Sequence, residues 1–321
     1  MEFLNKIFSI TPENKTELIQ EVFQFQLQNN KVYREWFELI GKQQQKPTAI
    51  PYLPVSFFKT HAITTTTFDP DVIFESSGTT TSINSKHYVK DWQVYETSFL
   101  KAFQQFYGAP QNWCMIGLLP AYLERKHSSL VAMVHTLVQQ SRHTDSGFYL
   151  YEYQQLHATL QRLEAVAQPV LLIGVTFALL DFAEQYPLPL KHTIIMETGG
   201  MKGRRKEITR EALHQQLKNA FGISQVHAEY GMTELLSQAY SSGNGRFYCP
   251  PWMQVLVRNE DDPLDVRLEG EGILNIIDLA NLYSCSFIAT DDVGKVYPDG
   301  SFEVWGRLDN SDIRGCSLLV T

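Results

Sequence analysis

The sequence FESSGTTTSINSK, at residues 74–86, places a loop of small hydroxyl residues directly after the apolar run Val72-Ile-Phe74. The run indicates a strand, and the loop then offers consecutive small residues: Ser76, Ser77, Gly78, Thr79, Thr80, Thr81 and Ser82. Gly78 allows a tight turn, and successive N–H groups and hydroxyls can form a nest for anionic oxygens. Lys86 could add the positive charge that a polyphosphate requires. The loop therefore predicts phosphate binding, although a Ser/Thr-rich surface loop has the same composition and the P-loop ending Gly-Lys-Ser/Thr is absent.

Strands and helices alternate along the chain beyond this loop. The hydrophobic pattern predicts helices at 12–45, 91–107, 128–140, 157–167, 177–185 and 210–221, and strands at 113–119, 147–151, 170–174, 193–197 and 225–229. Several of these strands are continuously apolar, as in Val170-Leu-Leu-Ile-Gly174, which is typical of strands buried on both faces. We therefore expect an α/β core with largely parallel sheets covered by helices.

The pattern changes after about residue 250. Short segments bounded by Gly, Asp and Pro predict strands at 254–258, 272–277, 284–289, 294–297 and 302–305. They indicate a small antiparallel β subdomain appended to the α/β body. We therefore expect an α/β body over 1–250, a β subdomain over 251–305 and a hinge-like tail over 306–321.

The composition excludes several classes of function. A net charge of −8 argues against nucleic-acid binding, and no apolar run reaches the length of about 18 residues that a membrane-spanning helix needs. The four cysteines are widely spaced without a CxxC pair, and the nine histidines show no HExxH spacing. This pattern argues against zinc and a disulfide framework, and favours a reducing cytoplasm.

Ligands of open α/β sheets bind beyond the carboxyl ends of the strands, so residues that follow strands are the candidates for a site. Gly199 and Gly200 follow the predicted strand 193–197 and permit close approach of a flat ligand, or simply allow the chain to enter a helix. The segment Tyr230-Gly-Met-Thr-Glu234 follows strand 225–229. There Tyr230 can stack on a planar base, Thr233 can bond a phosphate oxygen and Glu234 offers a carboxylate to magnesium, although a turn into a helix would also use Gly231 and Glu234.

Two later segments carry charge. Asp291 and Asp292 end the predicted strand that starts near residue 284, where they could accept hydrogen bonds from ribose hydroxyls or form an ordinary acidic turn. Arg307 and Arg314 are candidate anion ligands, or surface charges.

The order of these segments resembles the adenylate-forming superfamily of acyl-CoA synthetases, adenylation domains and luciferases. The matching motifs are Ser77-Gly-Thr-Thr80, Tyr230-Gly-Met-Thr-Glu234, Thr290-Asp-Asp292 and Gly306-Arg-Leu-Asp309. Within the superfamily, the stretches 119–131 and 197–206 are most similar to the LuxE-type acyl-protein synthetases and to phenylacetate–CoA ligase relatives. The resemblance covers about residues 50 to 321 and implies the N-terminal body of an adenylate-forming enzyme.

The resemblance also implies roles for individual residues. The loop 76–82 and Lys86 would hold the ATP phosphates, Gly199, Gly200 and Tyr230 would border adenine, and Thr233 would contact phosphate. Glu234 would bind Mg²⁺, and Asp292 and Arg307 would hold the ribose. Thr81 and Asp291 stand where the superfamily has glycines, so loop motion and ribose contacts would differ.

The superfamily continues beyond its hinge, here at Asp309, into a mobile domain that carries a lysine used in adenylation. Since this sequence stops at Thr321, we expect that domain to be missing or vestigial. Acyl-protein synthetases carry the acyl group on a cysteine near the C-terminus, and Cys316 fits that description.

The expected function is ATP-dependent activation of a carboxylic acid, fatty or aromatic, with transfer of the acyl group to a thiol. The acceptor would be Cys316, a carrier protein, or a partner such as a reductase. Two alternatives stay open: an acyl-CoA ligase of the phenylacetate type, and a nucleotide-binding relative without catalytic turnover.

Overall fold

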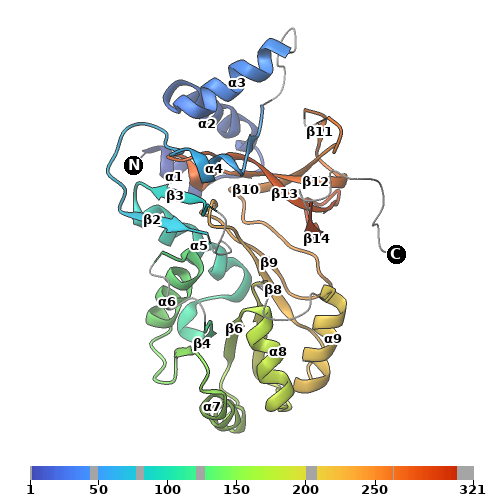
Figure 1. Cartoon of the computed structure of the whole chain (residues 1–321). Helices are drawn as coiled ribbons and strands as arrows, with labels where there is room; N and C mark the ends of the chain where they lie inside the picture. Colours follow the sequence, from blue (N-terminus) through green and yellow to red (C-terminus); the bar gives the residue numbers. More distant parts are fainter. Residues whose placement is uncertain are drawn as a thin grey trace.

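The computed structural model describes residues 2–43, 50–76, 83–120, 127–199, 208–262 and 264–308 (Figure 1). The α-helices are α1 (Glu2–Phe8), α2 (Lys15–Asn29), α3 (Lys31–Gln43), α4 (Phe57–Thr60), α5 (Trp92–Tyr107), α6 (Ser129–Ser141), α7 (Tyr153–Ala165), α8 (Thr176–Gln185) and α9 (Arg210–Phe221). Two 3-10 turns are η1 (Pro110–Asn112) and η2 (Leu279–Asn281). None of the helices in these ranges has the length and apolar character needed to cross a bilayer.

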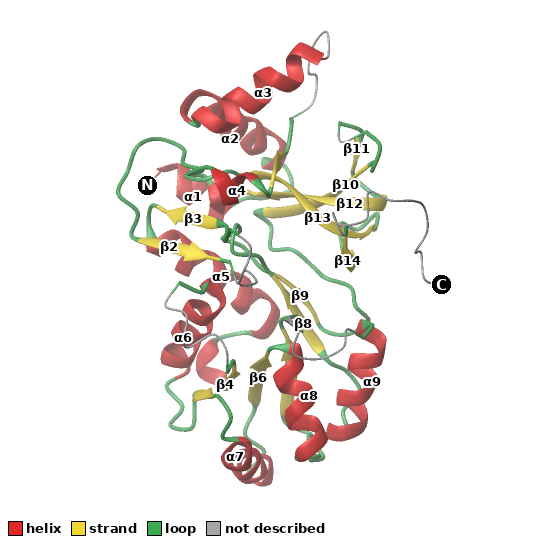
Figure 2. Ribbon diagram, in the orientation of Figure 1, coloured by secondary structure: helices red, strands yellow, loops and turns green. Residues whose placement is uncertain are grey.

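The strands fall into three sheets. They are β1 (Leu53–Pro54), β2 (Val72–Glu75), β3 (Lys86–Val89), β4 (Cys114–Leu118), β5 (Gly147–Tyr149), β6 (Val170–Gly174), β7 (Thr193–Glu197), β8 (His227–Tyr230), β9 (Ala239–Ser241), β10 (Met253–Arg258), β11 (Val266–Arg267), β12 (Gly270–Asp278), β13 (Phe287–Val296) and β14 (Phe302–Arg307). Figure 2 shows the two larger sheets one above the other, with the β2–β3 hairpin beside them.

The larger α/β sheet has the strand order β5-β4-β6-β7-β8-β9. All of its pairings are parallel except that of β9 with β8. The connection through α6 leads from β4 to β5, toward one edge of the sheet. The connections through α8 and α9 lead from β6 to β7 and from β7 to β8, toward the other edge. Right-handed crossovers therefore place α6 on one face and α8 and α9 on the other, as Figure 1 shows. Every residue of β4 and β6 is buried, which confirms the expected sheet covered on both faces.

The second sheet is mainly antiparallel, with the order β1-β13-β12-β10-β11 and β14 paired to β13. Its short edge strand β1 comes from the N-terminal part of the chain and pairs in parallel with β13. Helix α2 also packs against this sheet, because the buried amide of Gln26 donates to the carbonyls of Asn281 and Leu282 and accepts from the N–H of Ser286. The N-terminal residues thus complete the small sheet.

Several predicted elements have other bounds in the structure; the helix expected over 157–167, for example, is α7 at Tyr153–Ala165. The single helical region expected over 12–45 is divided into α2 and α3 at Asn30, whose backbone is extended. The strands expected at 284–289 and 294–297 form one strand, β13, so the prediction that Asp291 and Asp292 end a strand was wrong. They lie within it because the Asp292 carboxylate is satisfied by side chains from neighbouring strands. Strand β14 also runs two residues further than expected, to Arg307.

Candidate active site

A three-residue network joins the α/β sheet to the small sheet. The hydroxyl of Tyr230, at the end of β8, donates to Oδ2 of Asp292 over 2.7 Å, and Nε of Arg307 donates to Oδ1 over 2.9 Å. Asp292 is 4% exposed, whereas 71% of the Arg307 side chain is accessible. An ionised carboxylate has about four lone-pair sites, so Asp292 can also accept hydroxyl groups of a ligand. The structure thus brings together three residues that the sequence analysis proposed for the nucleotide.

The ring of Tyr230 lies in an aromatic cluster. It packs edge-on against Phe302, with centroids 5.4 Å apart, and against Phe247 at 5.9 Å, and the residue is only 9% exposed. Burial and the neighbouring Asp292 carboxylate raise the pKa of Tyr230, so its hydroxyl keeps its proton and donates. The hydroxyl of Tyr230 therefore orients the Asp292 carboxylate, a role that the sequence did not indicate. Stacking on a base stays a prediction.

The segment that follows Tyr230 is held by buried polar side chains from distant elements. Nδ1 of His87, on β3, lies 2.8 Å from the carbonyl oxygen of Thr233, and Nδ2 of Asn281 donates to the carbonyl of Glu234 over 2.6 Å. Asp278 accepts from the N–H groups of Leu236 and Ser237. These contacts hold the backbone of Thr233, Glu234 and the residues that follow in one conformation.

Protonation states follow from burial. Burial lowers the pKa of His87 to about 4, so the imidazole is neutral near pH 7 and its Nδ1–H donates to the Thr233 carbonyl. Burial raises the pKa of Asp278 to about 6 against the effect of its hydrogen bonds, so this carboxylate is mainly ionised at neutral pH. The sequence analysis missed His87, Asp278 and Asn281, because each stands outside a recognisable motif and acquires its role only through long-range packing.

Glu234 is suited to a magnesium ion held mainly by phosphate oxygens. It is 7% exposed, and burial raises the pKa of its carboxyl, opposed by a hydrogen bond from Ser85 and by the charges of Arg307 and Lys59. The described residues contain no group of three or more His, Cys, Asp or Glu side chains arranged for a metal. Mg²⁺ commonly takes only one or two protein carboxylates beside substrate phosphates, so this lone carboxylate fits such an ion.

The base of the hydroxyl-rich loop is formed by the β2–β3 hairpin. The N–H of Ser76 donates to the carbonyl of Ser85, and the N–H of Ser85 donates to Oγ of Ser76 over 2.9 Å. Lys86 is half exposed, and its Nζ lies 3.6 Å from Oε1 of Glu75. The remaining proposed loop ligands lie outside the described residues: Ser77, Gly78, Thr79, Thr80 and Thr81.

Gly199 follows β7 with φ of +73°, a backbone conformation that favours glycine. Its N–H donates over 2.7 Å to Glu197, a buried carboxylate that also lies 3.4 Å from Nε of Arg210. A Cβ at Gly199 would meet nothing within 4 Å, so the backbone conformation rather than space explains this glycine. Gly200 and Cys316 lie outside the described residues.

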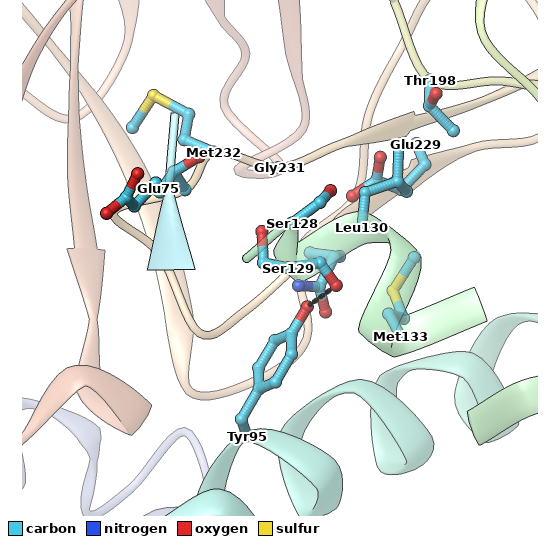
Figure 3. Close-up of a pocket in the computed structure, with 12 residues that line it drawn as sticks. Glu75, Tyr95, Ser128, Ser129, Leu130, Met133, Thr198, Glu229, Gly231 and Met232 are labelled. Atoms are coloured by element: carbon cyan, nitrogen blue, oxygen red, sulfur yellow. Dashed lines mark hydrogen bonds between the residues drawn. The ribbon is translucent and has the colours of Figure 1, made fainter. Parts of the chain in front are cut away.

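A cavity of about 120 Å³ opens beside these segments (Figure 3). The segment after Tyr230 contributes Gly231, Met232 and Thr233, and helices α5 and α6 contribute Tyr95, Leu130 and Met133. Figure 3 shows Glu229 and Thr198 on one side of it and Glu75 and Met232 on the other, with Tyr95 donating to the Ser129 carbonyl over 3.0 Å. The cavity thus borders Thr233, the residue that the sequence analysis proposed as a phosphate contact.

Solved structures of ligases share this fold. The 2-hydroxyisobutyryl-CoA ligase solved with R3-HIB-AMP matches with a TM-score of 0.63 and 10% identity, over 95% of this chain and 70% of that protein. MatB from Rhodopseudomonas palustris, solved with ATP, matches 75% of this chain with a TM-score of 0.54 and 15% identity. The o-succinylbenzoate CoA synthetase MenE from Bacillus subtilis, solved with AMP, matches 76% of this chain with a TM-score of 0.50 and 15% identity. The chain spans 49% of MatB and 64% of MenE.

These matches confirm the expected fold, the N-terminal body of an adenylate-forming enzyme. No curated protein matches the sequence. The family model described as "Acyl-protein synthetase, LuxE" matches residues 11–321, nearly the whole chain. The chain therefore belongs to the LuxE acyl-protein synthetase family.

Proposed function

We propose that this protein activates a carboxylic acid with ATP and Mg²⁺ as an acyl-adenylate and then transfers the acyl group to a thiol. The observation that carries the proposal is the convergence of Tyr230, Asp292 and Arg307 beside the Thr233–Glu234 segment, next to a separate cavity. Family membership supports the same reaction class.

In the first step, a carboxylate oxygen of the acid attacks the α-phosphorus of ATP, and the bond to the pyrophosphate oxygen breaks. Asp292 and Arg307 would hold the ribose, and Thr233 would bond a phosphate oxygen. Glu234 would hold Mg²⁺, which supplies charge neutralisation at the phosphates when bound. His87 and Asn281 fix the carbonyls of Thr233 and Glu234, so these groups need little reorganisation at the moment of reaction.

In the second step, a thiolate attacks the acyl carbonyl, and AMP leaves with the electron pair of the broken bond. Burial raises the pKa of Cys114 to about 11 and the pKa of Cys249 and Cys285 to about 12, so these thiols are poor nucleophiles at neutral pH. Cys316, outside the described residues, stays the internal candidate. A carrier or partner protein is the external one.

Exchange of labelled pyrophosphate into ATP tests the first step. We expect exchange that depends on both an added acid and Mg²⁺, and that falls in Asp292→Asn. Glu260→Gln, in an exposed loop, is the control. ATP binding in calorimetry without exchange for any acid of a broad panel would favour the alternative of a non-catalytic nucleotide-binding protein.

Retention of a radiolabelled acyl group tests the second step. We expect hydroxylamine-sensitive label on the protein that is lost in Cys316→Ala and kept in the control Cys249→Ala. If label instead appears only as a CoA thioester after CoA is added, the protein is an acyl-CoA ligase of the phenylacetate type.

A further inference from the structure

The cavity beside the nucleotide segment is lined by polar side chains where a plain fatty acid would need apolar ones. Glu229, on β8, and Gln238 line it together, and no positively charged side chain is among the described residues around it. Glu75, which also lines the cavity, lies 3.6 Å from Lys86, but Glu229 has no such cation among the described residues, so a triphosphate would meet an uncompensated carboxyl group there. The acid substrate is the better occupant, an assignment that depends on the proposed function.

Glu229 reaches this cavity because residue 231 is a glycine. A Cβ built on Gly231 would lie 2.5 Å from Oε1 of Glu229 and 3.5 Å from Cγ of Gln238. Gly231 is not among the glycines with positive φ, so a Cβ at this position would disturb the site mainly by displacing the end of the Glu229 side chain. The Glu229 carboxyl and the Gln238 side chain thus both lie next to the Cβ position of residue 231 at the cavity wall.

Neither polar group is fully satisfied within the described part of the chain. Oε1 of Gln238 is buried without a hydrogen-bond partner there, and the residue is 4% exposed. The Glu229 carboxyl has no hydrogen bond to a described residue, and burial and the neighbouring Glu197 raise its pKa to about 8. Gln238 is buried and Glu229 is half-buried, and such polar groups are normally paired, so the two at one cavity indicate that a ligand or ordered water completes them.

The apolar part of the cavity wall comes from Tyr95, Leu130 and Met133, and the wall also contains the polar residues Glu75, Ser128, Ser129, Thr198 and Thr233. We propose that the acid substrate has a short hydrocarbon body and carries, away from its carboxylate, a hydrogen-bond donor that Glu229 and Gln238 recognise: a hydroxyl or amino group. An alkyl chain of the same size would strip water from both groups without replacing its hydrogen bonds. Sites built to bond a hydroxyl or amino group reject analogues that lack it far more strongly than apolar pockets reject an extra methylene.

Matched acid pairs test this in the pyrophosphate exchange assay. The pairs are 4-hydroxyphenylacetate with 4-methylphenylacetate, and 6-hydroxyhexanoate or 6-aminohexanoate with heptanoate. We expect kcat/KM for the donor-bearing member of at least one pair to exceed that of its methyl partner by about 10²-fold or more. Equal or better exchange with the methyl partners would overturn the inference while leaving the proposed function intact. Absence of exchange with every acid would overturn both.

Variants distinguish the acid from the adenine amino group as the partner of these residues. In Gln238→Leu and in the more conservative Glu229→Gln, we expect KM for the preferred acid to rise about tenfold or more while KM for ATP changes less than about twofold. Gln216→Leu, on the exposed side of α9, is the matched control. A rise in KM for ATP instead, with KM for the acid unchanged, would assign the cavity to adenine and refute the proposal.

Discussion

Replacement of Glu229 by glutamine should make the protein more stable, and increasingly so as the pH rises. The side chain keeps its size and an acceptor oxygen, but it no longer has a proton to lose. Glu229 has a pKa of about 8 in the folded protein, against an ordinary value of 4.5, because burial and the charge of Glu197 disfavour its ionised form. Folding therefore retains a proton that the unfolded chain releases above about pH 4.5.

The sign and size of the pH effect on the free energy of unfolding follow from this difference in pKa between the folded and unfolded states. Between about pH 4.5 and pH 8 the folded state binds more protons than the unfolded state, so the free energy of unfolding falls as the pH rises. Each pKa unit corresponds to about 1.4 kcal/mol, so the full shift corresponds to about 5 kcal/mol. Because Glu229 is only partly buried, solvent screening reduces the expected loss to about 2–3 kcal/mol.

Urea unfolding followed by tryptophan fluorescence measures this effect directly, since the chain has five tryptophans. The free energy of unfolding of Glu229→Gln minus that of the wild type should grow from near zero at about pH 5 to about 2–3 kcal/mol at about pH 8.5. Groups such as Asp278 and His87 titrate in both proteins and cancel in the difference. A difference that stays flat over this range, or that falls, would refute the assignment of a neutral Glu229; Glu260→Gln should show no trend.

Three further changes test the framework of the site. His87→Ala removes the donor to the Thr233 carbonyl and should lower the free energy of unfolding in urea by about 1–3 kcal/mol. It should also lower kcat for pyrophosphate exchange, and an unchanged kcat would contradict the positioning role of His87. Tyr230→Phe should lose about 1 kcal/mol and raise KM for ATP, because Asp292 is no longer oriented; an unchanged KM would exclude this carboxylate from nucleotide binding. Gly231→Ala should raise KM for the acid more than KM for ATP, because its methyl group displaces the carboxyl that lies 2.5 Å from that position; the reverse order would argue against the acid cavity.

The central strands of the α/β sheet could be predicted from the sequence almost to the residue, whereas its edge strand β9 was not predicted. Continuous apolar runs such as Val170–Gly174 and Thr193–Glu197 have few alternatives to a buried strand, and both form the strands expected. Strand β13 could not be predicted in full, since its interior contains Asp291 and Asp292, a residue type depleted in strands. Only the approach of Tyr230 and Arg307 from other strands makes that placement favourable.

The site was predictable to a similar degree. Motif spacing proposed Tyr230, Asp292 and Arg307, which the structure brings together, while their roles and that of Glu234 stay predictions. Glu229 and His87 were missed, although Glu229 is the immediate neighbour of a motif residue. Their importance comes from desolvation and from contacts across many residues of chain, and neither can be read from the residue type.

The amide of Gln26, which bonds to residues 281, 282 and 286, has a consequence for biogenesis. When α2 leaves the ribosome, its partners have not yet been translated, and β1 likewise waits for β13. Helix α2 and strand β1 therefore lack these partners until residues 281–289 emerge, and such long-range contacts are associated with slow folding. From these long-range contacts we expect chaperones to improve expression, and a ribosome-stalled intermediate to be sensitive to protease near α2.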